Sequence, residues 1–449
     1  MTSLIVMLRR KLQQLPLVQI TLITAFAAFG CYTSMYAFRK AFTAGTFEGQ
    51  PLFLGVDYKV WLVIAQVFGY MLSKFYGIKF IAELGHRRRG QKILLLIGVA
   101  WFALLGFALV PPPYNVIFLF VNGLPLGMIW GLVFSYLEGR RTTEFLGAVM
   151  SVSLVFASGL VKTTGRTLMD TFTVSEYWMP FCTGLLFVIP LLCCTAMLEA
   201  VPLPDARDEA ARTVREPMGA HERKRFFLTY LPGLALAIFA YLLFTILRDM
   251  RDAFEVEIWA DVGVTGKHIY VQTDSAIALA VLMMMGLLMF VRNNLYAFTL
   301  IHLMMIAGCV LIGASTWLFQ LGRLGSVAWM SLAGLGLYMV YIPYNAIFFE
   351  RLLASFRHKG NVGFIMYVAD AVGYLGSVAV LVVHEWGFVH LSWGSFFQQA
   401  VFLSSVLGAG CIGISLLYFR RKHAGRETAL QRTSLDGTIN YSEYEYQKP

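Results

Sequence analysis

The chain has 449 residues, of which 58% are hydrophobic and only 14% are charged, and its mean hydropathy is +0.66. A composition this apolar over this length excludes a water-soluble globular protein and indicates a polytopic membrane protein. The net charge of +10 does not indicate nucleic-acid binding, because the basic residues stand in short segments between apolar runs.

Twelve apolar runs are long enough to cross about 30 Å of hydrocarbon as helices. Helices are favoured over barrel strands because the runs are continuous, whereas barrel strands are short and alternate in polarity. In chain order the predicted spans are Leu17–Ala44, Val56–Leu84, Ile93–Val110, Asn115–Glu138, Phe145–Met169, Trp178–Glu199, Phe226–Arg251, Ile269–Val291, Leu295–Leu318, Val327–Phe349, Val362–His384 and Phe396–Phe419.

A polar, charged linker separates six predicted spans from six others. Lysine and arginine are concentrated in the connections that share a side with both termini, while the other connections carry only Lys59, Lys267 and Arg323. This asymmetry places both termini in the cytoplasm, in a bacterial-type inner membrane. The predicted organisation is a cytoplasmic N-terminus (1–16), an N-terminal six-helix bundle (17–199), a cytoplasmic linker (200–225), a C-terminal six-helix bundle (226–420) and a cytoplasmic tail expected to be disordered (421–449).

The two halves of the sequence resemble each other. The segment from Gly123 to Trp130 matches the segment from Gly334 to Tyr341 at an offset of 211 residues, and Arg39 matches Arg248 at an offset of 209. Internal duplication predicts an all-α membrane protein with twelve transmembrane helices in two pseudo-symmetric six-helix bundles, which bind a ligand near the midplane. Chance similarity between apolar segments is the alternative explanation.

Several predicted spans contain ionisable side chains, which cost about 2.5–3.5 kcal/mol each at the centre of a helix and therefore face a partner or a water-filled cavity. Guanidinium groups bind phosphate or carboxylate through two parallel hydrogen bonds. We therefore predict a site for a small, doubly charged anion. Its predicted substrate-binding residues are Arg39, Arg248, Lys74, Tyr36, Tyr70, Lys162 and Arg166, and the candidates for proton coupling are Asp370 and Asp274.

Simpler explanations remain open for some of these residues. Arg39, Lys40 and Arg248 lie near the ends of their runs and could extend to the lipid headgroups. Arg166 could also be interfacial. Arg248 could be neutralised by Asp249 or Asp252, and the tyrosines could be packing residues. Small residues repeat every four residues and predict close helix contacts, at Gly123, Gly127 and Gly131 and likewise at Ala369, Gly373 and Ser377.

Short segments resemble the organophosphate:phosphate antiporters of the major facilitator superfamily, such as the glycerol-3-phosphate and hexose-phosphate transporters. Tyr36-Ala-Phe-Arg-Lys-Ala-Phe42 is similar to the first-helix Arg-Lys-x-Phe segment of that family, and Tyr70-Met-Leu-Ser-Lys-Phe75 to its second-helix Tyr-x-x-Ser-Lys-Phe segment. Gly373-Tyr-Leu-Gly376 is similar to a run in helix eleven. The resemblance implies that Arg39 and Arg248 hold a substrate phosphate.

The sequence also departs from that family. Helix five has Lys162 and Arg166 where the family carries a functional histidine, and Glu83-Leu-Gly-His-Arg-Arg-Arg-Gly90 is a degenerate form of the superfamily's loop motif. We expect a transporter that exchanges an organic anion for inorganic phosphate by alternating access. A proton-coupled anion symporter and a non-transporting sensor with a transporter fold are the alternatives. We expect no enzyme activity, because no nucleophile triad, metal-ligand cluster or phosphate-cradling loop is present. We also expect no cofactor, no partner beyond the anions and membrane lipid, and a monomer.

Overall fold

The computed structural model describes residues 2–82, 88–204, 208, 220–356, 362–386 and 391–435. Within these residues the fold is helical, and one isolated bridge pairs Phe53 with Val56. The elements are α1 (Thr2–Gln13), α2 (Leu17–Lys40), η1 (Ala41–Ala44), α3 (Tyr58–Ala82), α4 (Arg89–Leu109), α5 (Val116–Leu126), α6 (Ile129–Phe134), α7 (Thr143–Phe172), α8 (Met179–Ala200), α10 (Ala220–Asp261), α11 (Ile269–Met289), α12 (Asn294–Gln320), α13 (Ser326–Pro343), η2 (Tyr344–Phe348), α14 (Phe349–Ser355), α15 (Val362–Trp386) and α16 (Trp393–Leu435).

Ten helical segments in the described part of the chain are long and apolar enough to cross a membrane. The other two long helices, α3 and α15, have 25 residues each and coincide with the second and eleventh predicted spans. Each predicted span overlaps at least one of these helices, which supports an integral membrane protein. The fourth span is divided into α5 and α6, and the tenth into α13, η2 and α14.

The structure corrects the ends of several predicted segments. Helix α10 begins at Ala220, inside the predicted linker, and continues past Arg251 to Asp261 with non-helical geometry at Phe254. The prediction ended this span at Arg251 because charged residues follow, but those charges have partners in the other half of the molecule. Helix α16 continues into the predicted tail as far as Leu435. Residues 205–207, 209–219 and 436–449 of the predicted linker and tail lie outside the described residues.

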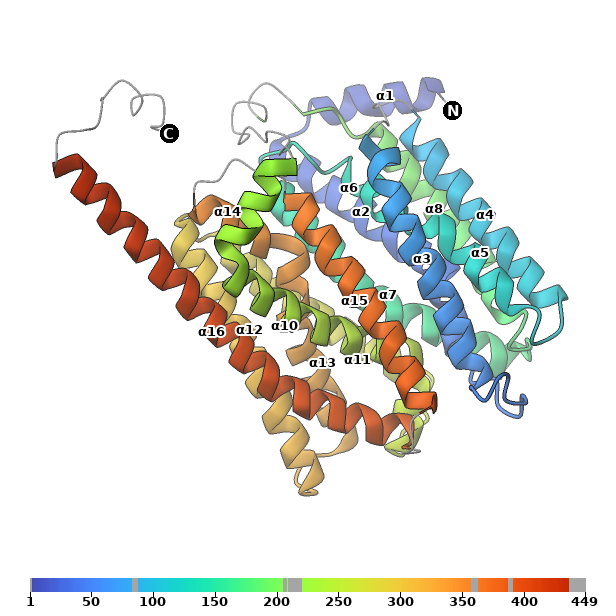
Figure 1. Ribbon diagram of the computed structural model, residues 1–449. Coiled ribbons are helices and arrows are strands. Elements are labelled where there is room, and N and C mark those ends of the chain that lie inside the picture. The colour runs from blue at the N-terminus through green and yellow to red at the C-terminus, as the bar shows by residue number, and fades with distance from the viewer. Residues whose placement is uncertain are drawn as a thin grey trace.

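The N-terminal and C-terminal halves lie side by side (Figure 1). The halves meet where α7 contacts α11 and where α3 contacts α15. These pairs are the fifth span with the eighth and the second with the eleventh, so a shift of six spans exchanges one contact for the other, as a pseudo-twofold relation requires. We call the face at which α2 begins and α16 ends the terminal face, and the face at which α2 ends and α3 begins the opposite face.

Glycines allow the closest of these helix contacts, as the repeats of small residues predict. A Cβ atom on Gly123 of α5 would lie 2.3 Å from the carbonyl oxygen of Gln66 in α3, and one on Gly127 would lie 2.6 Å from that of Tyr70. Between the halves, a Cβ atom on Gly159 of α7 would lie 2.4 Å from the carbonyl oxygen of Tyr270 in α11. Backbones that approach this closely place polar side chains from different helices within reach of one another.

Candidate functional site

Arg39 lies in the last turn of α2, between the two halves, and is only 3% exposed. Its guanidinium carbon lies 3.8 Å from the ring centroid of Tyr70 and 5.8 Å from that of Tyr36. Its backbone carbonyl accepts a hydrogen bond from Gln66, which also donates to Asn122 at 2.9 Å. Among the described residues no carboxylate pairs with Arg39, and its buried Nε has no hydrogen-bond partner. The groups that lie closest to the Arg39 guanidinium are therefore aromatic rings, whose faces attract a cation.

Arg248, the matching arginine of the second half, lies in α10 and is paired. Its Nη2 lies 2.6 Å from Oδ1 of Asp249, whose other oxygen accepts a 2.6 Å hydrogen bond from Ser377 of α15. The guanidinium carbon of Arg248 lies 4.7 Å from the ring centroid of Tyr341 and 5.9 Å from that of Tyr374. Asp249 therefore neutralises Arg248, as one of the alternatives from the sequence predicted.

Lys74 forms an ion pair across the halves with Asp370 of α15, which also accepts a hydrogen bond from Tyr241. The Lys74 Nζ lies 5.5 Å from the ring centroid of Tyr70 and 5.0 Å from that of Tyr374. Those two rings are themselves in edge contact, with centroids 5.4 Å apart. Through them the structure brings Arg39, Lys74 and Arg248 together, although these residues come from three different helices.

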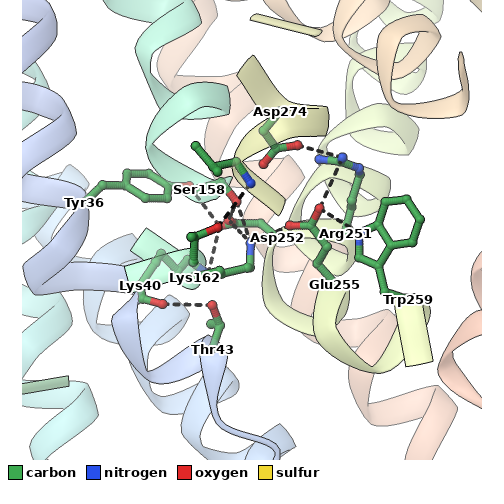
Figure 2. A network of polar contacts seen from close by, with 12 residues as sticks. Tyr36, Lys40, Thr43, Ser158, Lys162, Arg251, Asp252, Glu255, Trp259 and Asp274 are labelled. Atoms are coloured by element: carbon green, nitrogen blue, oxygen red, sulfur yellow. Dashed lines mark hydrogen bonds and ion pairs between the residues drawn. The ribbon is translucent and has the colours of Figure 1, made fainter. Parts of the chain in front are cut away.

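Asp252 of α10 is the centre of a second polar network (Figure 2). Its carboxylate accepts hydrogen bonds from the Tyr36 hydroxyl at 2.8 Å and the Ser158 hydroxyl at 2.7 Å. It also pairs with Lys40 at 3.4 Å and with Lys162 at 3.3 Å. All four of these partners belong to the N-terminal half, so a single acid of the C-terminal half connects α2 and α7 to α10.

The network continues toward α11 through fully buried charges (Figure 2). Lys162 lies 2.9 Å from Glu255, which lies 3.3 Å from Arg251. Arg251 in turn lies 2.7 Å from Asp274. Nearer the opposite face, Lys59 of α3 pairs with Glu257 of α10 and also donates to the carbonyl of Thr43 at 3.2 Å.

The structure clarifies where several singled-out residues lie. Neither Arg39, Lys40 nor Arg248 reaches the surface of the molecule, since each is at most 5% exposed. Arg166, one turn beyond Lys162 in α7, is only half-buried and does not join the central cluster. Lys59, which the charge pattern assigned to a connection, lies in the first turn of α3 and is 1% exposed.

Sequence reasoning missed two acids and one hydroxyl of the site. Glu255 and Glu257 fell outside the predicted seventh span, and Ser158 was not distinguished from other serines of α7. One signal was available for the acids. Apolar residues are interspersed with the acids from Ala253 to Trp259, so the span could have been extended past Arg251. Within the described residues, no group of three or more potential ligands could hold a metal ion.

The fold is similar to that of a solved transporter. A crystal structure of a D-xylose-proton symporter matches with a TM-score of 0.57 and 14% sequence identity, covering 88% of this chain and 96% of that chain. The chain therefore shares the overall fold of that symporter. No curated protein matches the sequence. A family model described as a family of unknown function, DUF5690, matches residues 41–422, and the chain therefore belongs to this family.

Proposed function

We propose that this protein is a secondary active transporter that moves a small organic anion by alternating access. The observation that carries the proposal is the isolation of Arg39, which is buried between the halves without an acidic partner among the described residues. An unpaired charge in such a place is costly, so it persists where a ligand supplies the counter-charge. The likeness to a symporter fold supports transport as the use of this site.

In the proposed mechanism the anion lies between Arg39 of the N-terminal half and Arg248 of the C-terminal half, with Lys74 assisting. The bound anion competes with Asp249 for Arg248 and with Asp370 for Lys74, because these acids pair with the two cations in the structure. Anion binding thus weakens one ion pair within the C-terminal half and one between the halves. This links binding of the anion to movement of the halves. The antiporter-like segments around Arg39 and Lys74 support inorganic phosphate as the counter-substrate and a phosphorylated metabolite among the candidate substrates.

The decisive experiment is exchange by the purified protein in liposomes loaded with phosphate and offered labelled phosphorylated and carboxylated metabolites. We expect uptake that Arg39→Gln abolishes, because the substitution keeps the polar shape and removes the charge. Arg323→Gln is the matched control, since Arg323 is exposed in the connection between α12 and α13. Exchange that persists undiminished in the Arg39→Gln protein would sink the proposal. Ligand binding without any flux would identify a sensor instead.

Proton-coupled symport is the second candidate, and the environment of Asp370 favours it. This carboxylate is only partly buried, with 15% of the side chain exposed, and it contacts Lys74 and Tyr241, which belong to different halves. Protonation of Asp370 would break its ion pair with Lys74 and so couple proton binding to the movement of the halves. Uptake driven by a pH gradient and lost in Asp370→Asn supports this candidate, whereas uptake indifferent to the gradient and to the substitution removes it.

A further inference from the structure

The buried charges between the halves match one another with a single exception. Six cations each have a carboxylate of their own: Lys40 with Asp252, Lys59 with Glu257, Lys74 with Asp370, Lys162 with Glu255, Arg248 with Asp249 and Arg251 with Asp274. Arg39 is the seventh cation of this set and has no acid in the described part of the chain. The formal charge of the set is therefore +1.

The excess charge is not shared with a neighbouring arginine. Arg166 also lacks an ion pair among the described residues, but it is only half-buried and lies one turn beyond Lys162, toward the opposite face. Arg39 is 3% exposed, and the rings of Tyr36 and Tyr70 lie beside its guanidinium. One negative charge placed against Arg39 would make the whole set neutral.

Neutrality matters because this cluster lies within the apolar part of the molecule and must survive a rearrangement of the halves. Transferring uncompensated charge into a low-dielectric interior is costly, whereas a neutral, fully paired set avoids that cost. A ligand with two negative charges would leave the occupied set at −1, and an uncharged ligand would leave it at +1. A monoanion is the only simple ligand that brings it to zero.

Three tyrosine hydroxyls beside this charge are available for hydrogen bonding. Tyr32, Tyr70 and Tyr374 are each at most 4% exposed, and their hydroxyls have no hydrogen-bond partner among the described residues. None of the three hydroxyl oxygens is among the fully buried polar atoms that lack a partner, so each borders accessible space in which a polar atom of a ligand could form a hydrogen bond with it. A polyhydroxylated ligand satisfies this requirement better than an apolar one.

We propose that the substrate carries one negative charge and several hydroxyl groups, as a sugar acid does. This inference rests on the proposed transport of an organic anion and narrows it. Phosphate monoesters, which the antiporter-like segments imply, carry about −1.5 to −2 charges at pH 7 and exceed what the cluster can neutralise. The charge count thus favours a carboxylate over the doubly charged anion expected from the sequence.

A series of ligands with one carbon skeleton and different charges tests the proposal. Binding of glucose, gluconate, glucarate and glucose 6-phosphate to the purified full-length protein is measured by calorimetry at pH 7.5 and low salt. We expect gluconate to bind at least about tenfold more tightly than the other three, a difference of about 1.4 kcal/mol. Tighter binding of either dianion or of glucose, or no binding of any of the four, overturns the proposal.

Removing one acid from the set provides the matched variant. Asp370→Asn raises the formal charge to +2, so we expect the preference to move from gluconate toward glucarate, and Asp249→Asn should do the same if the first variant does not fold. Asp170→Asn removes an exposed carboxylate at the end of α7 and should leave the order unchanged. An unchanged order in both site variants contradicts the charge argument. Dianion exchange by the wild-type protein would contradict it too, while leaving anion transport standing. If no anion is exchanged, both the proposed anion transport and the proposed monoanionic substrate are contradicted.

Discussion

At the scale of single residues, the two acids that the sequence nominated for proton coupling have different surroundings. Asp370 is partly exposed and contacts both halves. Asp274 is fully buried and pairs with Arg251, which belongs to the same half. A pair confined to one half keeps its geometry when the halves move, so its role is to hold α10 against α11. A third acid, Asp252, connects the halves and is only 3% exposed.

We predict that Asp274→Asn and Arg251→Met each destabilise the protein by about 3–5 kcal/mol, because each removes the closest partner of a buried charge. The double variant Arg251→Met with Asp274→Leu should recover much of this loss, since it removes both charges. Unfolding in detergent measures the effect, and Asp170→Asn is the control on an exposed carboxylate. If Asp274→Asn leaves stability unchanged and eliminates only uptake driven by a pH gradient, Asp274 is instead a coupling residue.

Individual charges could be singled out from the sequence, but their partners could not. Arg39 and Lys74 were conspicuous because a charge within an apolar run is costly wherever the chain folds. The partner of Lys74 lies 296 residues away, and that of Lys59 lies 198 residues away. Ion pairs of this kind depend on which helices of the two halves face each other, and hydropathy along one chain contains no information about that.

At the scale of elements, the crossing of α7 and α11 depends on Gly159. A Cβ atom at this position would lie 2.4 Å from the carbonyl oxygen of Tyr270 and 2.8 Å from the Cβ of Asp274. Toward the opposite face the same two helices are joined by hydrogen bonds from the Val271 amide to Thr163 at 3.2 Å and, across the chain that precedes α11, from Lys267 to Thr171 at 3.0 Å. The crossing therefore closes the molecule on that side.

We predict that Gly159→Ala pushes α7 from α11 and opens the opposite face. The readout is the rate at which a maleimide labels Thr43→Cys in detergent, in a background without the six native cysteines, because Thr43 is fully buried beside this face. We expect several-fold faster labelling. Gly286→Ala is the control within α11, since its added Cβ would meet open space. Equal labelling in the two variants would show that the crossing does not control access.

The elements were the part of the structure that the sequence predicted best. Runs of apolar residues identify membrane helices because backbone polar groups in lipid must be satisfied within the helix itself. The prediction failed at the end of α10, where Glu255 and Glu257 continue the helix beyond Arg251. There the lysines of the other half neutralise the acids, so a tertiary contact overrides the local cost that ended the predicted span.

At the scale of the whole molecule, most ion pairs between the described parts of the halves join a cation of the N-terminal half to an acid of the C-terminal half. Arg351 with Glu144 is the reverse case. The N-terminal half contributes Lys40, Lys59, Lys74 and Lys162, and each of them pairs with an acid of the C-terminal half. Pairs of this kind must break on the side that opens and can remain intact on the side that stays closed. The position of each pair along the membrane normal therefore determines whether it opposes opening at the terminal face or opening at the opposite face.

Lys59 and Lys74 lie on the same helix, about 22 Å apart at 1.5 Å per residue, and so oppose openings at different levels. We predict that Lys59→Glu, which sets two acids against each other at the opposite face, accelerates labelling of Thr43→Cys. Combining it with Glu257→Lys should restore the slow rate, because the pair is re-formed with its charges exchanged. Lys74→Glu should leave the rate low, since the Lys59 pair still closes that face. Acceleration by Lys74→Glu as well, or failure of the exchanged pair to restore the slow rate, would mean that the charges stabilise the halves generally rather than closing them at separate levels.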